Sequence, residues 1–304
     1  MTLTDLTVEN PADAPNGDGI DVDSSRNVRI SDCDIGVGDD AVCLKSGKDA
    51  EGRAVGRPTE AVTVTNCTVE AGHGGVGVGS ETAGDVRDVT VSNCTFVDTD
   101  RGVRIKTCRG RGGVVEDLRF DTLAMRRVAC PFVVNGFYQT DVETDPRPID
   151  AGTPVVRNVR FHHVTARNVE SAGFLAGLPE RRFAGFSFED VEIDATRPLD
   201  ATPLSPAMAE GYDQRHGFFC RAVDDVSVSN VRLRVPDAPF VTATDAGTLS
   251  VDGLRLTDEP PTPVLAVEDV DGPYVSVRGD LGRVSLRANH GDLASAVVEA
   301  DSAE

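Results

Sequence analysis

The sequence predicts an all-β fold, a right-handed parallel β-helix in which short strands stack coil upon coil. Three observations carry this prediction. A strand–turn–strand unit recurs nine times along the chain. Glycine is abundant, with 30 residues, whereas aromatic residues make up only 5%, which argues against a wide aromatic-filled core. Glycine, proline and β-branched residues interrupt every window that could form a helix.

The nine units share an alternation of apolar and polar residues, and eight of them have Asn, Asp or Gly near the middle, a pattern typical of a strand, a turn and a second strand. The units begin at positions 1, 28, 62, 89, 118, 159, 186, 226 and 249, as in VRISDCDI, VTVTNCTV and VTVSNCTF. A period of 23 to 29 residues, lengthened by insertions, indicates a solenoid. The leucine-rich repeat frame is missing, and propeller blades are longer, so a β-helix is favoured.

Three cysteines, Cys33, Cys67 and Cys94, occupy the same position in consecutive units. We expect them to form one interior row of small buried side chains rather than a disulfide or a metal site. Seven cysteines is an odd number, so at least one is unpaired. No Cys-x-x-Cys pair occurs, so the sequence does not support a zinc site, and it predicts no cofactor.

The whole chain, 1–304, is expected to form a single domain. Three longer spacings predict loops at about 46–60, 132–153 and 198–217, and the tail at about 294–304 is expected to fray. The repeat begins at Met1 with no preceding cap, although a solenoid needs both ends covered. We therefore expect an uncovered N-terminal end in this sequence, so that either another element covers this end or the sequence is a fragment.

The chain is strongly acidic, with a formal net charge of −20 and a pI near 4.6. Only three of its 30 cationic residues are lysines: Lys45, Lys48 and Lys106. Such a surface should repel nucleic acids and anionic membranes, and it resembles that of halophilic proteins. No apolar run is long enough to span a bilayer, and no signal peptide follows Met1. A monomer is expected.

Four polar motifs fall within about ninety residues, and each leads into or forms a short strand. They are NGDGID (16–21), GDD (38–40), GHG (72–74) and RIK (104–106). Equivalent residues of successive coils lie one strand spacing apart, about 4.8 Å. Alignment of the apolar residues places Asp18 in one column with Asp40, and Asp39 in one column with His73.

The same alignment makes Arg104 and Lys106 project from this face, in the columns of Cys43 and Lys45. The combined surface is a cluster of three carboxylates beside an imidazole and two or three cations. Carboxylates stacked a few ångströms apart repel each other, which should raise at least one pKa and leave a proton available near neutrality. Acid/base cleavage of a glycosidic bond needs such a pair of groups.

The set NGDG, GDD, GHG and RIK, in this order, resembles glycoside hydrolase family 28, the polygalacturonases and related pectin hydrolases. The runs GRPTEAVTVTNCTVEAGHGGVGVGSE and DRGVRIKTCRGRGGVVEDL are most similar to bacterial and archaeal members. The resemblance covers Leu3 to about Tyr138. It departs from the family at Gly17, where threonine is usual, and at Met1, before which relatives carry further coils.

The resemblance implies an inverting hydrolysis of α-1,4-galacturonosidic bonds. It makes Asp39 the general acid that protonates the glycosidic oxygen. Asp18 and Asp40 would hold and deprotonate the attacking water, and His73 would support the protonation state of the acid.

The resemblance also implies how an acidic polysaccharide is bound. Arg104 and Lys106 would bind a substrate carboxylate, and Tyr138 would contact the substrate. Lys45, in the column beside the carboxylates, would add to the local cationic patch. Family members are secreted, so an extracellular location is implied although no signal peptide is visible.

Three alternatives remain open. The first is a related glycosidase acting on rhamnogalacturonan or a decorated galacturonan. The second is a pectate lyase or uronate epimerase on the same scaffold, and a lyase would need calcium. The third is an inactive carbohydrate-binding β-helix.

Overall fold

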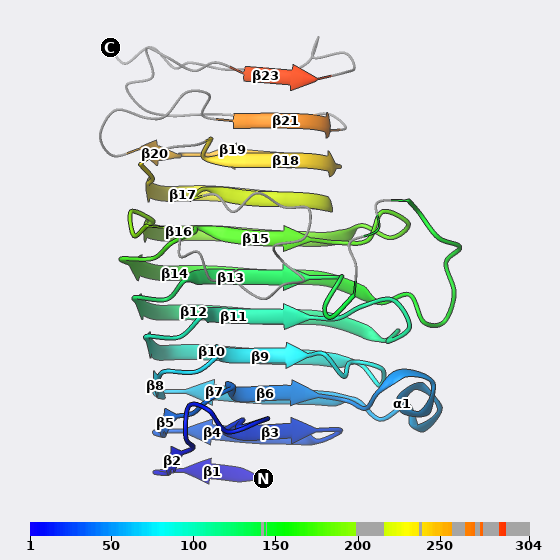
Figure 1. Cartoon of the computed structure of the whole chain (residues 1–304), viewed down its shortest axis with the longest axis vertical. Helices are drawn as coiled ribbons and strands as arrows, with labels where there is room; N and C mark the ends of the chain where they lie inside the picture. The colour runs from blue at the N-terminus through cyan, green and yellow to red at the C-terminus, as the bar shows by residue number, and fades with distance from the viewer. Residues whose placement is uncertain are drawn as a thin grey trace.

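The computed structural model describes residues 1–140, 143, 145–198, 216–236, 239–256, 265–270, 274–275 and 286–289. Within these residues the chain winds through stacked coils, and every named strand pairs in parallel with a strand of at least one neighbouring coil (Figure 1). The predicted all-β parallel β-helix is therefore confirmed. No helix in the described part of the chain has the length and apolar character needed to cross a membrane.

The strands form three rows along the helix axis. The first row contains β1 (Thr2–Thr4), β4 (Arg26–Ser31), β7 (Thr59–Thr65), β19 (Leu249–Asp252) and β22 (Tyr274–Val275). The second row contains β2 (Thr7–Glu9), β5 (Asp34–Gly36), β8 (Thr68–Glu70) and β20 (Arg255–Leu256). Longer strands continue through the turn and belong to both rows: β10 (Val86–Val97), β12 (Val114–Arg126), β14 (Val155–Arg167), β16 (Phe183–Asp194) and β17 (Phe218–Arg234).

The third row carries the polar motifs. It contains β3 (Ile20–Asp23), β6 (Asp40–Lys45), β9 (Gly74–Gly79), β11 (Arg101–Lys106), β13 (Cys130–Asn135), β15 (Gly173–Ala176), β18 (Val241–Ala246), β21 (Leu265–Val270) and β23 (Leu286–Asn289). The first residues of β17 pair with β15 and β18 and so join this row as well.

The turn between the first and second rows explains the residue at the middle of each repeat. The fifth residue of all nine units has a positive φ, at Asp5, Asp32, Asn66, Asn93, Thr122, His163, Asp190, Asn230 and Gly253. Asn, Asp and Gly tolerate this left-handed conformation best. Their side chains also bond from coil to coil: Asn93 Nδ2 donates to Asn66 Oδ1 at 2.7 Å, and Asn66 Nδ2 donates to Asp32 Oδ1 at 3.1 Å.

The row of cysteines lies inside the coils, as predicted. Cys33, Cys67 and Cys94 are 1%, 2% and 2% exposed. Each thiol donates to the carbonyl oxygen of the residue two positions before it, which satisfies the buried S–H group. Leu123 continues the row in the next coil, opposite Cys94.

The middle coils contain more aromatic packing than composition predicted. Phe161 stacks between Phe120 and Phe188, with ring centroids 5.2 and 5.0 Å away, and Phe132 packs against it at 4.6 Å. The expectation of a core without aromatic filling is therefore wrong for these coils. Phe120, Phe161 and Phe188 occupy the same position in three successive strands, so the coil repeat stacks them on one another.

The loops differ from their predicted bounds. The loop at 46–60 contains a short helix, α1 (Asp49–Val55), which ends at Gly56 with φ 57° and a bond from its N–H to the carbonyl of Gly52. The loop predicted at 132–153 begins only after Asn135, because the apolar run before it forms β13 and buries Phe132 completely. Most of 198–217, and the whole tail at 294–304, lie outside the described residues.

We predict that Phe161→Ala lowers the free energy of unfolding by about 3–5 kcal/mol, because it removes the ring that joins three others and leaves a cavity. Urea denaturation followed by circular dichroism measures the change. Arg160→Ala, on the exposed side of the same strand, is the control and should cost less than about 0.5 kcal/mol. Similar losses for the two variants would contradict the stacked core.

Candidate active site

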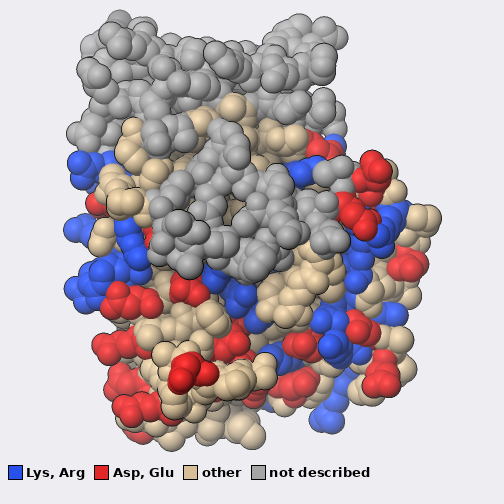
Figure 2. Space-filling model, viewed as in Figure 1, with Lys and Arg blue, Asp and Glu red and all other residues tan. Residues whose placement is uncertain are grey.

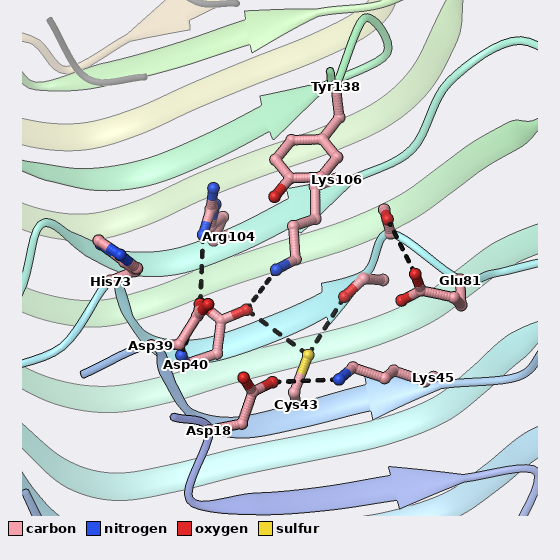
Figure 3. A network of polar contacts seen from close by, with 12 residues as sticks. Asp18, Asp39, Asp40, Cys43, Lys45, His73, Glu81, Arg104, Lys106 and Tyr138 are labelled. Atoms are coloured by element: carbon pink, nitrogen blue, oxygen red, sulfur yellow. Dashed lines mark hydrogen bonds and ion pairs between the residues drawn. The ribbon is translucent and has the colours of Figure 1, made fainter. Parts of the chain in front are cut away.

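The four motifs meet on the outward face of the third row, on β3, β6, β9 and β11 and the turns that precede them (Figure 3). Cys43 of β6 pairs with Gly77 of β9, and Gly77 pairs with Arg104 of β11. Asp40 pairs with Gly74. These pairs confirm two of the predicted columns, the one that joins Asp40 to Gly74 and the one that joins Cys43 to Arg104.

Two glycines of β9 make room for the carboxylate of Asp40. A Cβ atom added at Gly77 would lie 2.3 Å from Asp40 Oδ2, and one added at Gly74 would lie 2.6 Å from Asp40 Oδ1. Both positions therefore require glycine while Asp40 keeps this conformation. The glycine-rich run GHGGVGVG thus allows a side chain from one coil to reach across the next.

Asp40 is completely buried and is bound by cations. Lys106 Nζ lies 2.6 Å from Oδ2, and Arg104 Nη1 lies 3.4 Å from Oδ1. Burial alone would raise the pKa of Asp40, but the charges of Lys106 and Arg104 outweigh it and hold the pKa below its ordinary value. The lowered pKa of Asp40 is the opposite of the raised pKa that stacked carboxylates led us to expect.

The two cations are less accessible than expected. Arg104 and Lys106 are 7% and 6% exposed, although both do lie on the outward face. The ring of Tyr138 covers them, with its centroid 5.2 Å from Arg104 Cζ and 5.3 Å from Lys106 Nζ. Burial lowers the pKa of Lys106, but the carboxylate of Asp40 outweighs burial, so the net shift is upward and the ammonium stays charged.

Asp39 lies beside Asp40 at the start of β6 and is partly exposed. Its Oδ1 accepts the backbone N–H of Asp40 at 3.0 Å. The N–H of Asp39 donates to the carbonyl of Gly17, and the carbonyl of Asp39 accepts the N–H of His73. The predicted column that joins Asp39 to His73 is therefore present in the backbone.

Lys45 binds two acids rather than lying free for substrate. Its Nζ is 3.1 Å from Asp18 Oδ2 and 2.7 Å from Asp21 Oδ2. Asp21 was not among the predicted site residues, although its position in NGDGID, three residues after Asp18, points to it. Burial is the main cause that raises the pKa of Asp21, and Lys45 opposes it. Ligand atoms of Asp18, Asp21 and Cys43 lie within 4.8 Å of one another, but the ammonium of Lys45 already supplies the positive charge, so we propose no metal there.

His73 has a partner, Asp100, that was not among the predicted site residues. Its Nδ1 lies 2.6 Å from Oδ2 of Asp100, which directly precedes β11. The hydrogen bond with Asp100 is the main cause that raises the pKa of His73, although partial burial opposes it. Arg101 Nη1 donates to the same oxygen at 3.1 Å. The Asp-Arg pair just before the glycine and valine that lead into RIK was the available signal.

We predict that Lys106→Met destabilises the protein by about 3–5 kcal/mol at neutral pH, because it leaves the buried carboxylate of Asp40 with a single distant cation. The pKa of Asp40 is depressed in the folded state, so its stabilisation is present above the unfolded pKa, about 3.9, and is lost as pH falls through the lower folded value. The difference between variant and wild type should therefore shrink in acid.

Urea denaturation at neutral pH and near pH 3, below the unfolded pKa of the aspartate, measures this difference. Lys48→Met is the matched control, since Lys48 is exposed in the loop that contains α1. Equal losses for the two lysine variants, or a difference between them that does not change with pH, would contradict the buried pair.

Comparisons with known proteins agree with this geometry. The model of the family "Glycosyl hydrolases family 28" matches residues 1–203. A probable polygalacturonase of Vitis vinifera is 34% identical over 214 residues, which cover 69% of this chain and 43% of that protein. An endo-polygalacturonase of Pectobacterium carotovorum subsp. carotovorum is 37% identical over 139 residues, which cover 46% of this chain and 33% of that protein.

Two solved structures of exopolygalacturonases are also similar to this chain. A hyperthermoactive exopolygalacturonase from Thermotoga maritima superposes with a TM-score of 0.58 and 29% identity, over 65% of this chain and 43% of that one. A family 28 exopolygalacturonase of Yersinia enterocolitica, with a TM-score of 0.55, 19% identity and coverage of 86% and 39%, shows the fold alone. The chain spans less than half the length of each of these relatives. Because the family model covers two thirds of the residues and its motifs form one polar cluster, this chain belongs to glycosyl hydrolase family 28.

Proposed function

We propose that this protein hydrolyses the α-1,4-galacturonosidic bonds of polygalacturonan by an inverting acid/base reaction. The observation that carries the proposal is the cluster of Asp18, Asp39 and Asp40 on one face beside the cations Arg104 and Lys106. Carboxyl groups supply the acid and base of glycoside hydrolysis. Cations beside them select a substrate that carries carboxylates itself.

Asp39 is the best candidate for the general acid. Asp18 forms an ion pair with Lys45, and Asp40 forms ion pairs with Lys106 and Arg104. Among the described residues, Asp39 is the one member of the three with no cationic side chain at ion-pair distance. A bound cation favours the ionised carboxylate, so the acid without one is the best able to carry the proton that the leaving oxygen needs.

Asp18 and Asp40 contribute as the base, in different ways. The side chain of Asp18 is 14% exposed and can contact a water molecule directly. That of Asp40 is buried beneath the cations, so its charge holds Lys106 and Arg104 in place and orients that water from behind. The two aspartates stand about one coil apart, roughly 4.8 Å, closer than the separation usual in inverting enzymes. Both therefore act on a single water rather than on opposite sides of the bond.

Arg104, Lys106 and Tyr138 are proposed to bind the carboxylate of a galacturonate unit. The guanidinium group of Arg104 has five N–H donors and gives one long bond, 3.4 Å, to Asp40. Within the described part of the chain its other donors bond to no side chain, and we propose that they bind a second carboxylate. Tyr138 limits the approach from one side, so the carboxylate enters along the side of Asp39.

The net charge of −20 requires that the cations act at short range. Figure 2 shows Lys and Arg side chains interspersed with Asp and Glu over the described part of the visible face, rather than gathered in one large basic area. Salt screens exposed charges beyond about 8 Å at physiological ionic strength. Binding of a polyanionic substrate therefore depends on the ion pairs that its carboxylates form with these cations at contact distance.

The proposal is tested by incubating the protein with polygalacturonic acid and measuring reducing ends. We expect activity on this polymer and little on the same polymer after its carboxyl groups are reduced to alcohols. Asp39→Asn should lower the rate by about 10²–10⁴-fold, the usual contribution of general acid catalysis. Binding without new reducing ends would indicate a carbohydrate-binding β-helix, and unsaturated products that require calcium would indicate a lyase.

The division of roles has its own test. A substrate whose leaving group departs without protonation should restore much of the lost rate in Asp39→Asn, because that variant lacks only the proton donor. It should restore little in Asp18→Asn, which lacks the group that activates water. Asp18→Asn is the matched control, since both variants replace a partly exposed aspartate by asparagine. Equal rescue of the two variants would refute the assignment.

A further inference from the structure

We propose that Asp100, anchored by Arg101, is a positioning residue for His73 that fixes the imidazole with a proton on Nδ1. The role of this contact in catalysis rests on the proposed function above, whereas the protonation and tautomer of His73 do not. Neither the family motifs nor the comparisons assign a role to Asp100 or Arg101.

The backbone holds the two partners together independently of their side chains. The N–H of Asp100 donates to the carbonyl of Gly72 at 2.9 Å, and the N–H of Arg101 donates to the carbonyl of His73 at 3.2 Å. Backbone hydrogen bonds therefore join Asp100 and Arg101 to Gly72 and His73. The 2.6 Å contact between His73 Nδ1 and Asp100 Oδ2 is therefore part of a defined turn rather than a chance meeting of surface side chains.

Arg101 gives this contact its rigidity. Its side chain is only 5% exposed, and its Nη1 donates to the same Asp100 oxygen at 3.1 Å. Gly74 is its neighbour in the previous coil and has no side chain to share the space. Nε and Nη2 of Arg101 are buried and have no hydrogen-bond partner among the described residues. Asp100 is consequently the group that balances this buried charge, and displacement of Asp100 would cost far more than loss of an exposed ion pair.

The charged groups around His73 explain the sign of its titration. Asp100 and Asp39 favour the imidazolium, while partial burial and Arg104 disfavour it. Asp100 is the largest of these influences, so the pKa of His73 is raised and the cation persists to higher pH than in an ordinary histidine. Deprotonation then removes the proton on Nε2, since Nδ1 remains bonded to the carboxylate.

A cation at this position has a definite consequence for the reaction. It stabilises the carboxylate that Asp39 becomes once its proton has passed to the leaving oxygen. The sequence-based expectation was that His73 keeps Asp39 protonated. A positive charge has the opposite effect on the resting acid and assists the step in which the proton leaves.

The first experiment measures His73 directly, by NMR titration of its ring resonances, assigned with His73→Asn. In the wild type we expect a pKa above the ordinary value, about 6.5, and nitrogen shifts of the neutral ring that show the proton on Nδ1. In Asp100→Asn the pKa should fall toward or below that ordinary value, because the neutral amide keeps the shape and loses the charge. Asp98→Asn is the control. Asp98 lies two residues before Asp100 and forms an exposed ion pair with Arg127, so its replacement should leave the titration of His73 unchanged.

An unchanged pKa in Asp100→Asn, or a neutral ring protonated on Nε2 in the wild type, would overturn the proposal. If Asp100→Asn does not fold, the wild-type titration decides alone, and a value at or below 6.5 contradicts it. The second experiment uses the hydrolysis assay: the alkaline limb of the pH–rate profile should move to lower pH in Asp100→Asn but not in Asp98→Asn. Because the titration needs no substrate, absence of activity would count against the proposed function and leave the positioning role standing.

Discussion

The buried ion pairs of Asp40 with Lys106 and Arg104 are the constraint on which the rest of the site depends. A carboxylate that is completely removed from water is tolerated only with paired cations, and Lys106 supplies one at 2.6 Å. Since β6 and β11 are separated by the coil of β9, this pairing requires a strand between them with no side chains in the way. Gly74 and Gly77 provide that strand.

Removal of three charges from solvent also determines what each neighbour can do. Tyr138 covers the cations, and Lys45 is occupied by Asp18 and Asp21. Asp39 is left as the aspartate of the cluster that has no cation bonded to it within the described structure. The three carboxyl groups therefore differ mainly in whether a cation is paired with them, and less through repulsion between the carboxylates.

The solenoid brings these residues together with only one short repeat of chain between one contributing strand and the next. Each coil returns to the same face after one repeat, so Asp40, His73 and Arg104 come together although they are far apart in sequence. The turn residues and the interior rows repeat in every coil and carry the stability. The outward positions of the third row are then free to differ from coil to coil. This separation of supporting residues from the outward polar residues keeps the polar cluster on rigid strands.

The sequence by itself determined the fold and the register of the coils, because period-2 alternation and a constant unit length define the register of a β-helix. It did not determine which charges pair. The contact of Asp40 with Lys106 crosses an intervening strand, and that of His73 with Asp100 joins two turns, so neither follows from position in a repeat. Burial, the space left by glycines and the direction of long side chains decided these partners, and all three exist only in the folded chain.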